Sequence, residues 1–268
     1  MNLKKIESFS RYQEIVERYG QKGCWSNDYI QTEAEGIIEN NCLYEQCCDK
    51  NAFLFVEKSG FLRLYYYVND PSEIVAFDNR EYVTEILYRG FQGEPVEQIE
   101  YLQHCGFQRH LTRDLMGAQY ANLTESIPVP GLCIGDAVSL EEVKWAAELF
   151  NLTFDKWSGD YISPSSYKSL LDSNAMLIAK DLQGNMLGAF ESSVERNVNW
   201  LRHFAITESA RGKGVGKALF NAVIEKGHID EKTRYMLWVQ HQNETAIGMY
   251  QKKGFKYMGK SSLSMIIV

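Results

Sequence analysis

The sequence has no apolar run long enough to span a bilayer, and its first residues lack the apolar core of a secretory signal peptide. It also has no excess of basic charge, because 28 lysines and arginines stand against 35 aspartates and glutamates, a net charge of −7. This balance argues against generic binding to nucleic acid or to an anionic membrane, while it permits a local basic site. We expect a cytoplasmic protein with neither nucleic acid nor membrane as its partner.

Cysteine is absent beyond Cys133, and the six cysteines up to that point lack the spacing of zinc ligands. Cys47 and Cys48, for example, are adjacent. These features predict buried free thiols, without disulfides and without a bound metal.

The length of 268 residues, 45% of them hydrophobic and 24% charged, is typical of a soluble globular protein with one large domain or two smaller ones. Within residues 126–131, two prolines and a glycine interrupt any periodic structure. We therefore predict a linker at residues 126–135, between a first domain of residues 1–125 and a second of residues 136–268.

Hydrophobic periodicity predicts a mixed α/β fold in both halves. The expected helices are residues 6–19, 96–104, the segment after the Ser139–Glu142 capping box, and 244–252. The expected strands are a hairpin at 52–68, then 82–88, 176–179, 186–190, 198–206, 236–239, 255–258 and 263–268, while residues 20–49 are expected to be irregular. Residues 102–107 resemble residues 250–255 at equal spacing, which indicates two degenerate copies of one unit.

Residues 204–219 combine an apolar run, a glycine-rich turn and an amphipathic helix. Gly212, Gly214 and Gly216 lack a Cβ, so the turn can present its backbone N–H groups to an anion. The first turn of the helix adds further unpaired N–H groups, and Arg211 adds a permanent positive charge. A tight connection without a ligand stays an alternative for such a turn.

Two nucleotide-binding motifs fit this turn poorly. A P-loop needs glycine at position 211 and Ser or Thr at position 218, where the chain has Arg211 and Ala218. A dinucleotide fingerprint needs the spacing G-x-G-x-x-G and an acidic residue after a second strand, and this chain has neither.

Asn243 and Tyr250 are separated by about two helical turns, which places both on one face of the expected helix. Together with Arg211–Gly216, they resemble the GNAT superfamily of acetyl-CoA-dependent N-acetyltransferases, over most of residues 136–268. The turn fits the family's pyrophosphate motif, and Asn243, Ala246, Tyr250 and Gly254-Phe255 match its later helix. The resemblance implies two GNAT-like lobes, each a twisted mixed sheet flanked by helices.

The same resemblance implies that acetyl-CoA, the coenzyme A thioester, lies between splayed strands. Its pantetheine arm is expected along the backbone near Phe204 and Ile206, and its pyrophosphate on the glycine-rich turn. The implied cofactor-binding residues are Phe204, Ala205, Ile206, Arg211, Gly212, Lys213, Gly214, Val215, Gly216, Lys217, Asn243 and Tyr250.

The implied reaction is direct attack on the thioester by a primary amine of a small molecule or peptide. A backbone N–H near Ile206 would stabilise the oxyanion, and Tyr250, protonated at neutral pH, would donate a proton to the departing CoA thiolate. Glu191, Glu195 and His203 are the candidate bases for the amine, and the sequence leaves the choice open. A non-catalytic acyl-CoA-binding module and a transferase that uses a longer acyl-CoA stay as alternatives.

The first half resembles the family only faintly. It has Pro95, Gln98 and Leu102 where the second half has Asn243, Ala246 and Tyr250, and no Arg-x-x-Gly-x-Gly motif precedes them. We therefore expect a degenerate first lobe that shapes the acceptor site or completes the core, and a single active centre in the second lobe.

Overall fold

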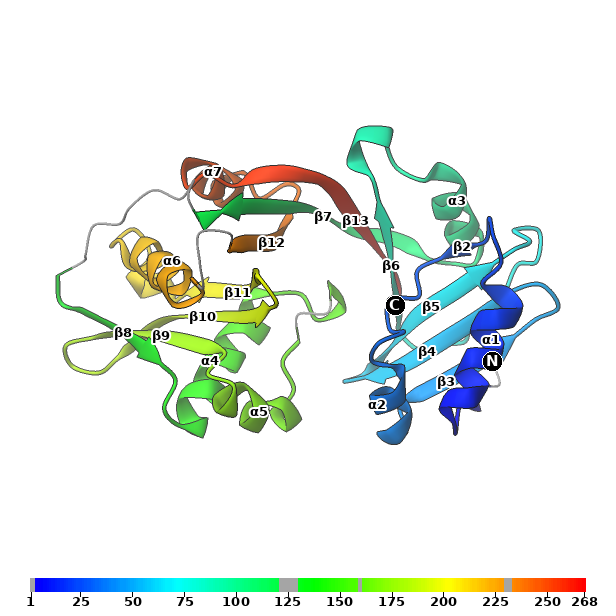
Figure 1. Cartoon of the computed structure of the whole chain (residues 1–268), viewed down its shortest axis with the longest axis horizontal. Helices are drawn as coiled ribbons and strands as arrows, with labels where there is room; N and C mark the ends of the chain where they lie inside the picture. The colour runs from blue at the N-terminus through cyan, green and yellow to red at the C-terminus, as the bar shows by residue number, and fades with distance from the viewer. Residues whose placement is uncertain (1–2, 121–129, 159–160, 229–232) are drawn as a thin grey trace. The chain divides into compact units, whose positions relative to one another are not determined.

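The computed structural model describes residues 3–120, 130–158, 161–228 and 233–268 (Figure 1). The chain divides into two compact units, the first formed by Met1–Thr112 and Lys260–Val268 and the second by Arg113–Gly259. Within the described ranges, no helix combines the length and the apolar character needed to span a bilayer.

The first unit contains a mixed sheet in the order β1, β3, β4, β5, β6, β13, with β2 paired to β5. Only β5 and β6 are parallel neighbours in this unit. Its strands are β1 (Lys4–Lys5), β2 (Trp25–Ser26), β3 (Leu43–Cys47), β4 (Ala52–Lys58), β5 (Phe61–Val68), β6 (Tyr82–Tyr88) and most of β13 (Lys256–Ile267). Its helices are α1 (Phe9–Tyr19), α2 (Ala34–Glu39), the 3-10 helix η1 (Gly90–Gln92) and α3 (Val96–His104).

The second unit contains a mixed sheet in the order β7, β12, β11, β10, β9, β8, in which β11 and β12 are the parallel neighbours. Its strands are β7 (Gln108–Gln119), β8 (Leu132–Asp136), β9 (Met176–Asp181), β10 (Met186–Glu195), β11 (Val198–Ile206) and β12 (Arg234–Gln240). Its helices are α4 (Leu140–Thr153), α5 (Tyr167–Asp172), α6 (Val215–Lys226), α7 (Glu244–Lys252) and the 3-10 helices η3 (Lys156–Ser158), η4 (Pro164–Ser166) and η5 (Glu208–Ala210).

The two units are built alike, and each is completed by a strand of the other copy. In the first unit the parallel partner β6 pairs antiparallel with β13 over residues 261–267, and in the second unit β12 pairs antiparallel with residues 113–119 of β7. Figure 1 shows the red strand β13 leaving α7 and running beside β6. The compact units therefore differ from the lobes 1–125 and 136–268 expected from the sequence, because the closing strands of the two copies are exchanged.

Local sequence signals explain several element ends. Ser139 accepts a hydrogen bond from the Glu142 backbone N–H at the start of α4, and the Glu142 carboxylate accepts one from Val138 N, the residue before the cap, which is a variant of the capping box. Helix α6 ends before Gly227, where an added Cβ would lie 1.6 Å from the Asn199 amide nitrogen. Only glycine lets α6 end so close to β11.

The predicted mixed α/β fold is confirmed, and the helix at 244–252 and the strand at 198–206 have the predicted bounds. Three expectations were wrong. Residues 20–49 contain α2 and β3 rather than irregular chain, the two expected closing strands form the single strand β13, and the first helix begins at Phe9 after its cap Ser8. Residues 126–129 of the predicted linker lie outside the described residues, and β8 begins at Leu132.

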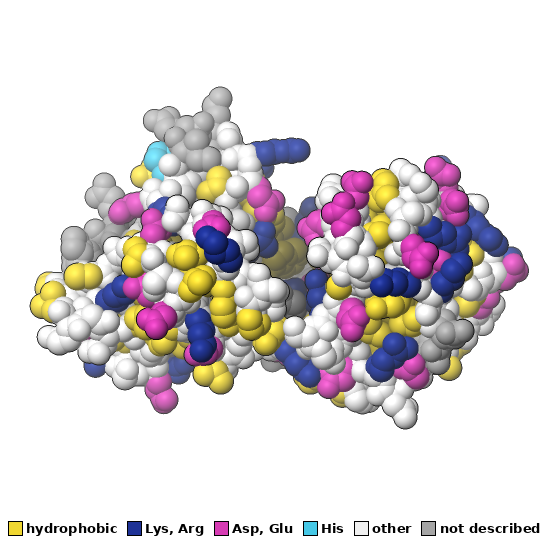
Figure 2. Space-filling view, turned by 90° about the horizontal axis from the view of Figure 1, so that it is seen from below, with side chains coloured by type: hydrophobic (Ala, Val, Ile, Leu, Met, Phe, Trp, Pro, Cys, Tyr) yellow, Lys and Arg dark blue, Asp and Glu magenta, His cyan; other side chains and the backbone are white. Residues whose placement is uncertain are grey.

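All six cysteines are free, but only Cys105 is buried, so the expected burial was wrong for the others. Charged side chains of both signs are interspersed over both units on the face shown in Figure 2.

Candidate active site

The parallel strands β11 and β12 separate after a short common stretch. They pair only at Val198–Trp200 with Arg234–Met236, although β11 continues to Ile206 and β12 to Gln240. No segment of the described chain pairs with β11 on this side beyond Trp200. Backbone N–H and C=O groups at such a split need partners, so the split can accept the amide groups of an extended ligand.

The glycine-rich turn lies at the end of β11, after η5. Gly212 (φ 74°) and Gly214 (φ 83°) adopt the left-handed conformation that favours glycine, and Gly214 is the N-cap of α6. Among the described residues no side chain caps the first turn of α6, so its N–H groups are available to an anion. The structure therefore has the geometry of the anion cradle that the sequence predicts.

Three exposed cations surround this turn, namely Arg211, Lys213 and Lys217. None of them forms an ion pair with a described residue. The cradle thus combines unpaired N–H groups with uncompensated positive charge, which favours a polyanionic ligand.

Gly216 packs against the side chains of β11. An added Cβ would lie 3.4 Å from both the Phe204 ring and the Ile206 side chain, so these three residues form one wall between α6 and β11. Phe204 stacks on Phe190 with ring centroids 4.7 Å apart. Ala205 points the other way, into the cluster around Phe150, so it can contribute only backbone atoms to the split.

Tyr250 lies in α7 and is buried against the rings of Phe220 and Phe255, at centroid distances of 5.7 and 5.8 Å. This burial raises its pKa to about 12. Its hydroxyl forms no hydrogen bond with another described residue. The phenol is therefore a neutral donor over the whole physiological pH range.

Asn243 is the N-cap of α7 rather than a residue on its face. Its Oδ1 accepts a hydrogen bond from the Ala246 backbone N–H at 3.1 Å, and its side chain is exposed. The expectation that Asn243 and Tyr250 project from one helical face was wrong for this reason. The Asn243 oxygen has a capping role, which leaves the amide nitrogen to contact a ligand.

Two of the three candidate bases lie together. The His203 Nδ1 and the Glu191 Oε2 are 2.5 Å apart, both side chains are buried, and the imidazole stacks on Phe150 at 5.3 Å. Glu195 lies apart from them on the exposed surface, where Arg202 donates a hydrogen bond to it at 2.8 Å. A carboxylate that accepts the Nδ1 proton makes Nε2 the basic nitrogen of a neutral imidazole.

The His203–Glu191 pair lies on the sheet face opposite to α6. Leu201 packs with the α6 cluster, Arg202 is the extra residue of a bulge in β11, and His203 then faces α4. Trp200 and Val198 share the face of His203, because Asn199 between them contacts the end of α6. One face of the split thus carries the cradle, and the other carries the basic pair.

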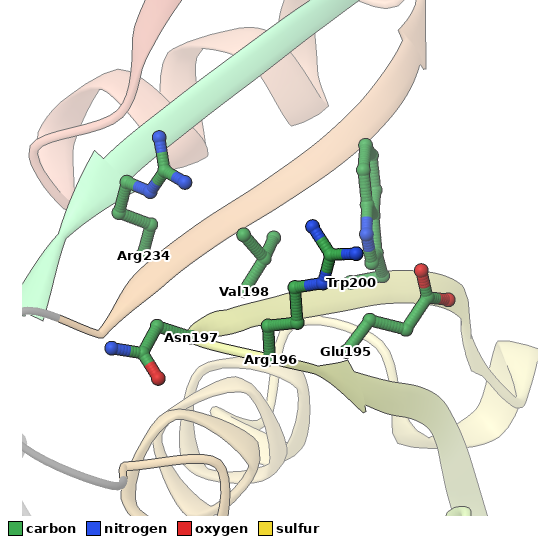
Figure 3. A pocket seen from close by; sticks show the side chains of 6 residues that line it. All are labelled: Glu195, Arg196, Asn197, Val198, Trp200 and Arg234. Carbon is green, nitrogen blue, oxygen red and sulfur yellow. The ribbon is translucent and has the colours of Figure 1, made fainter.

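An open pocket of about 440 Å³ lies on this second face, at the hairpin between β10 and β11 (Figure 3). Its lining comes from the hairpin, from the first residues of β11 and from the start of β12. The lining residues are Glu195, Arg196, Asn197, Val198, Trp200 and Arg234.

The equivalent split in the first unit is filled by the chain itself. Strands β5 and β6 pair only at Leu62–Leu64 with Tyr82–Thr84, and β2 then pairs with β5 at Tyr67 and Val68. The buried Asn27 bridges both strands: its Nδ2 donates to Thr84 Oγ1 and Glu85 O, each at 2.9 Å, and its Oδ1 accepts from Tyr66 N at 2.8 Å. No helix lies between β5 and β6, so this unit also lacks the counterpart of α6.

Sequence reasoning missed the pocket and the filling segment. Strand alternation past the bulge could have placed Trp200 and His203 on one face, but the bulge itself has no clear sequence signal. Asn27 lies in a stretch that gave no periodic pattern, and its partners are far away in the chain.

Comparison with known proteins was made for the whole chain. Residues 144–255 match the acetyltransferase (GNAT) family. A spermine/spermidine N(1)-acetyltransferase of Bacillus subtilis (strain 168) is 37% identical over 81 residues, which cover 28% of this chain and 52% of that protein. The chain therefore matches only about half the length of this curated relative.

Solved structures show the same fold over the whole chain. A tandem GNAT protein from the clavulanic acid biosynthesis pathway, without AcCoA, aligns with 99% of this chain and 98% of its own, at a TM-score of 0.61 and 10% identity. An acetyltransferase from the GNAT family of Colwellia psychrerythraea aligns over 99% of both chains, at a TM-score of 0.54 and 13% identity. At these identities the likeness establishes the fold alone, a tandem GNAT arrangement.

Proposed function

Residues 144–255 make the chain a member of the acetyltransferase (GNAT) family, and on that premise we propose that its second unit transfers an acetyl group from acetyl-CoA to a primary amine. The acceptor is a small molecule or a peptide. The observation that carries the proposal is the unfilled split between β11 and β12, which ends at an uncapped helix N-terminus with uncompensated positive charge.

The turn and the split bind the two parts of CoA. The N–H groups of Gly212 to Gly216, with Arg211, Lys213 and Lys217, hold the pyrophosphate. The unpaired backbone of β11 beyond Trp200 hydrogen-bonds the pantetheine amides, while Phe204, Ile206 and Gly216 pack against its apolar atoms. Asn243 contributes its amide nitrogen from the start of α7.

The residues around the split supply the proton transfers. His203 Nε2, with its tautomer set by Glu191, accepts the proton of the attacking amine from the face opposite to α6. A new C–N bond forms, the C–S bond of the thioester breaks, and Tyr250 donates its proton to the departing thiolate. A β11 backbone N–H near Ile206 donates to the carbonyl oxygen while it carries negative charge.

Thiol release from acetyl-CoA in the presence of a panel of amines tests this function, with the product identified by mass spectrometry. The expected result is amine-dependent thiol release and an acetylated amine. CoA binding without any amine-dependent release would replace the proposal by a non-catalytic acyl-CoA-binding module. Absence of CoA binding by calorimetry would overturn both.

The length of the acyl chain is tested with the same assay. Acetyl-CoA is expected to be used faster than butyryl-CoA or octanoyl-CoA. A preference for one of the longer thioesters would keep the transferase and change its donor.

A further inference from the structure

The pocket at the β10–β11 hairpin has a positive charge that the chain does not neutralise. Arg196 and Arg234 both line it, and neither forms an ion pair with a described residue. Glu195 also lines it, but this carboxylate is bound by Arg202, which lies on the bulge of β11. The uncompensated groups in the pocket are therefore two guanidinium groups, which favour an anion.

The backbone at Arg196 shows that the hairpin holds an arginine where glycine is the usual residue. Arg196 has φ 57°, in the left-handed region, at the turn between β10 and β11. Asparagine, the residue type of the next position, Asn197, tolerates the left-handed region better than arginine does, and glycine would adopt it without strain. A strained arginine that lines a pocket points to a role for its side chain.

Apolar surface lies between this charge and the basic pair. Figure 3 shows the Arg196 side chain reaching between Val198 and Trp200, and the Arg234 side chain extending from the start of β12 on the other side of Val198. Val198 and Trp200 are only partly buried and share the sheet face of His203. An indole offers a flat apolar surface for the body of a bound molecule.

The spacing along β11 sets the length of that molecule. At about 3.3 Å per paired residue, and with Arg202 left out because it is the extra residue of the bulge, Trp200 and His203 are roughly 7 Å apart, and Val198, beside Arg234, lies about 13 Å from His203. An extended peptide covers this span with about three or four residues. A free α-amino acid, whose amine and carboxylate share one carbon, is too short.

From these observations we infer that the acceptor is an elongated amine whose anionic group binds between Arg196 and Arg234, about 7–13 Å from the nitrogen that is acetylated, with an apolar body on Trp200. The inference rests on the proposed acetyl transfer and names its substrate class. A short peptide with a free N-terminal amine and a free carboxylate has this chemistry. A polyamine does not, because its far end is cationic and would meet two arginines.

Matched acceptors measure this selectivity in the wild-type protein. The probes are Gly-Phe-Gly with a free carboxylate, Gly-Phe-Gly-amide, free phenylalanine and spermidine, each assayed for kcat and KM. The free tripeptide is expected to have a kcat/KM at least roughly tenfold above each of the others, mainly through a lower KM. Equal kcat/KM for the acid and the amide, or a preference for spermidine, would overturn the inference.

Substitution of the two arginines tests whether they cause the preference for an acceptor with a free carboxylate. Arg196→Gln with Arg234→Gln should remove the preference for the acid over the amide, mainly by raising the KM of the acid. Arg89→Gln, at an exposed arginine of the first unit without an ion pair to a described residue, is the control that should keep the preference. A double variant that retains the preference would place the anion elsewhere and overturn the assignment.

A measurement of CoA affinity distinguishes an error in the acceptor class from an error in the proposed acetyl transfer. If CoA binds and amines are acetylated without regard to their charge, the acceptor class is wrong and the proposed function stands. If CoA does not bind, both are wrong.

Discussion

The two units contain the same split between parallel strands, and they use it differently. In the first unit Trp25 and Ser26 pair with β5, and Asn27 satisfies backbone groups of both strands. In the second unit β11 and β12 separate with no described segment of the chain paired between them, beside an α6 N-terminus whose cap Gly214 makes no side-chain hydrogen bond. The described residues fill the split in the first unit, whereas the open split in the second unit leaves backbone groups that need partners, which supports the proposed binding of CoA there.

The difference also shows how one copy can lose a ligand without losing its fold. The described connection from β5 to β6 has no helix, so no helix N-terminus follows this split as that of α6 follows the split in the second unit. The Asn27 side chain supplies the hydrogen bonds that an extended ligand would otherwise make. In the first unit the groups of β5 and β6 that Asn27 contacts therefore have partners within the chain.

Filling the open split would make the second unit like the first. Gly216→Trp is expected to weaken CoA binding by roughly 100-fold or more, measured by calorimetry, because the side chain would occupy the space beside Phe204 and Ile206. Gly216 has an ordinary helical φ, so the backbone tolerates the change. Gly36→Trp in α2, where an added Cβ meets nothing within 4 Å, is the control, and an unchanged affinity in Gly216→Trp would remove the split as the CoA site.

Removal of the Tyr250 hydroxyl, the proposed proton donor, should lower the rate of acetyl transfer without weakening CoA binding. Tyr250→Phe is expected to lower kcat by roughly 100-fold, since a positioned acid contributes that much, while CoA affinity stays within about twofold. Single-turnover kinetics and calorimetry measure the two effects. A variant with wild-type kcat would exclude Tyr250 as the donor.

Opening the filled split should destabilise the first unit and leave the second unchanged. Asn27→Leu deprives Tyr66 N and Glu85 O of partners in a buried site, so the free energy of unfolding should fall by about 2–4 kcal/mol in urea titrations. CoA affinity should not change. Asn40→Ala, at an exposed asparagine bonded to Gly36 O, is the control with an expected loss below about 1 kcal/mol; an equal loss in both variants would contradict the bridging role of Asn27.

The smallest expected effect is on the pH dependence of kcat. A tyrosine donates a proton only while neutral, and burial raises the pKa of Tyr250 to about 12, so its donor form persists as the pH rises through the ordinary phenol pKa of about 10. At saturating amine, kcat should therefore stay level between about pH 8 and 10.5. A fall with an apparent pKa near 10, absent in Tyr250→Phe, would show an exposed phenol instead.

Sequence patterns predicted the parts of the molecule whose signals are local. The glycines at 212 and 214, the cap at Ser139 and the periodic strand 198–206 each carry their signal within a few residues, and each lies in the structure as predicted. The pairing of His203 with Glu191 depends on the register of two strands and on a bulge between them. The exchange of β7 and β13 depends on pairing over most of the chain, which no local pattern encodes.

The exchanged strands also set the order in which the protein can fold during synthesis. Tyr88 pairs with Ser261, so the sheet of the first unit is complete only after nearly the whole chain has left the ribosome. Until then the edge of β6 that pairs with β13 is unpaired. The edge of β7 that pairs with β12 is likewise unpaired until β12 has been made. Pairing between strands so far apart in the sequence is slow, so the last steps of folding in both units depend on strands made late in synthesis.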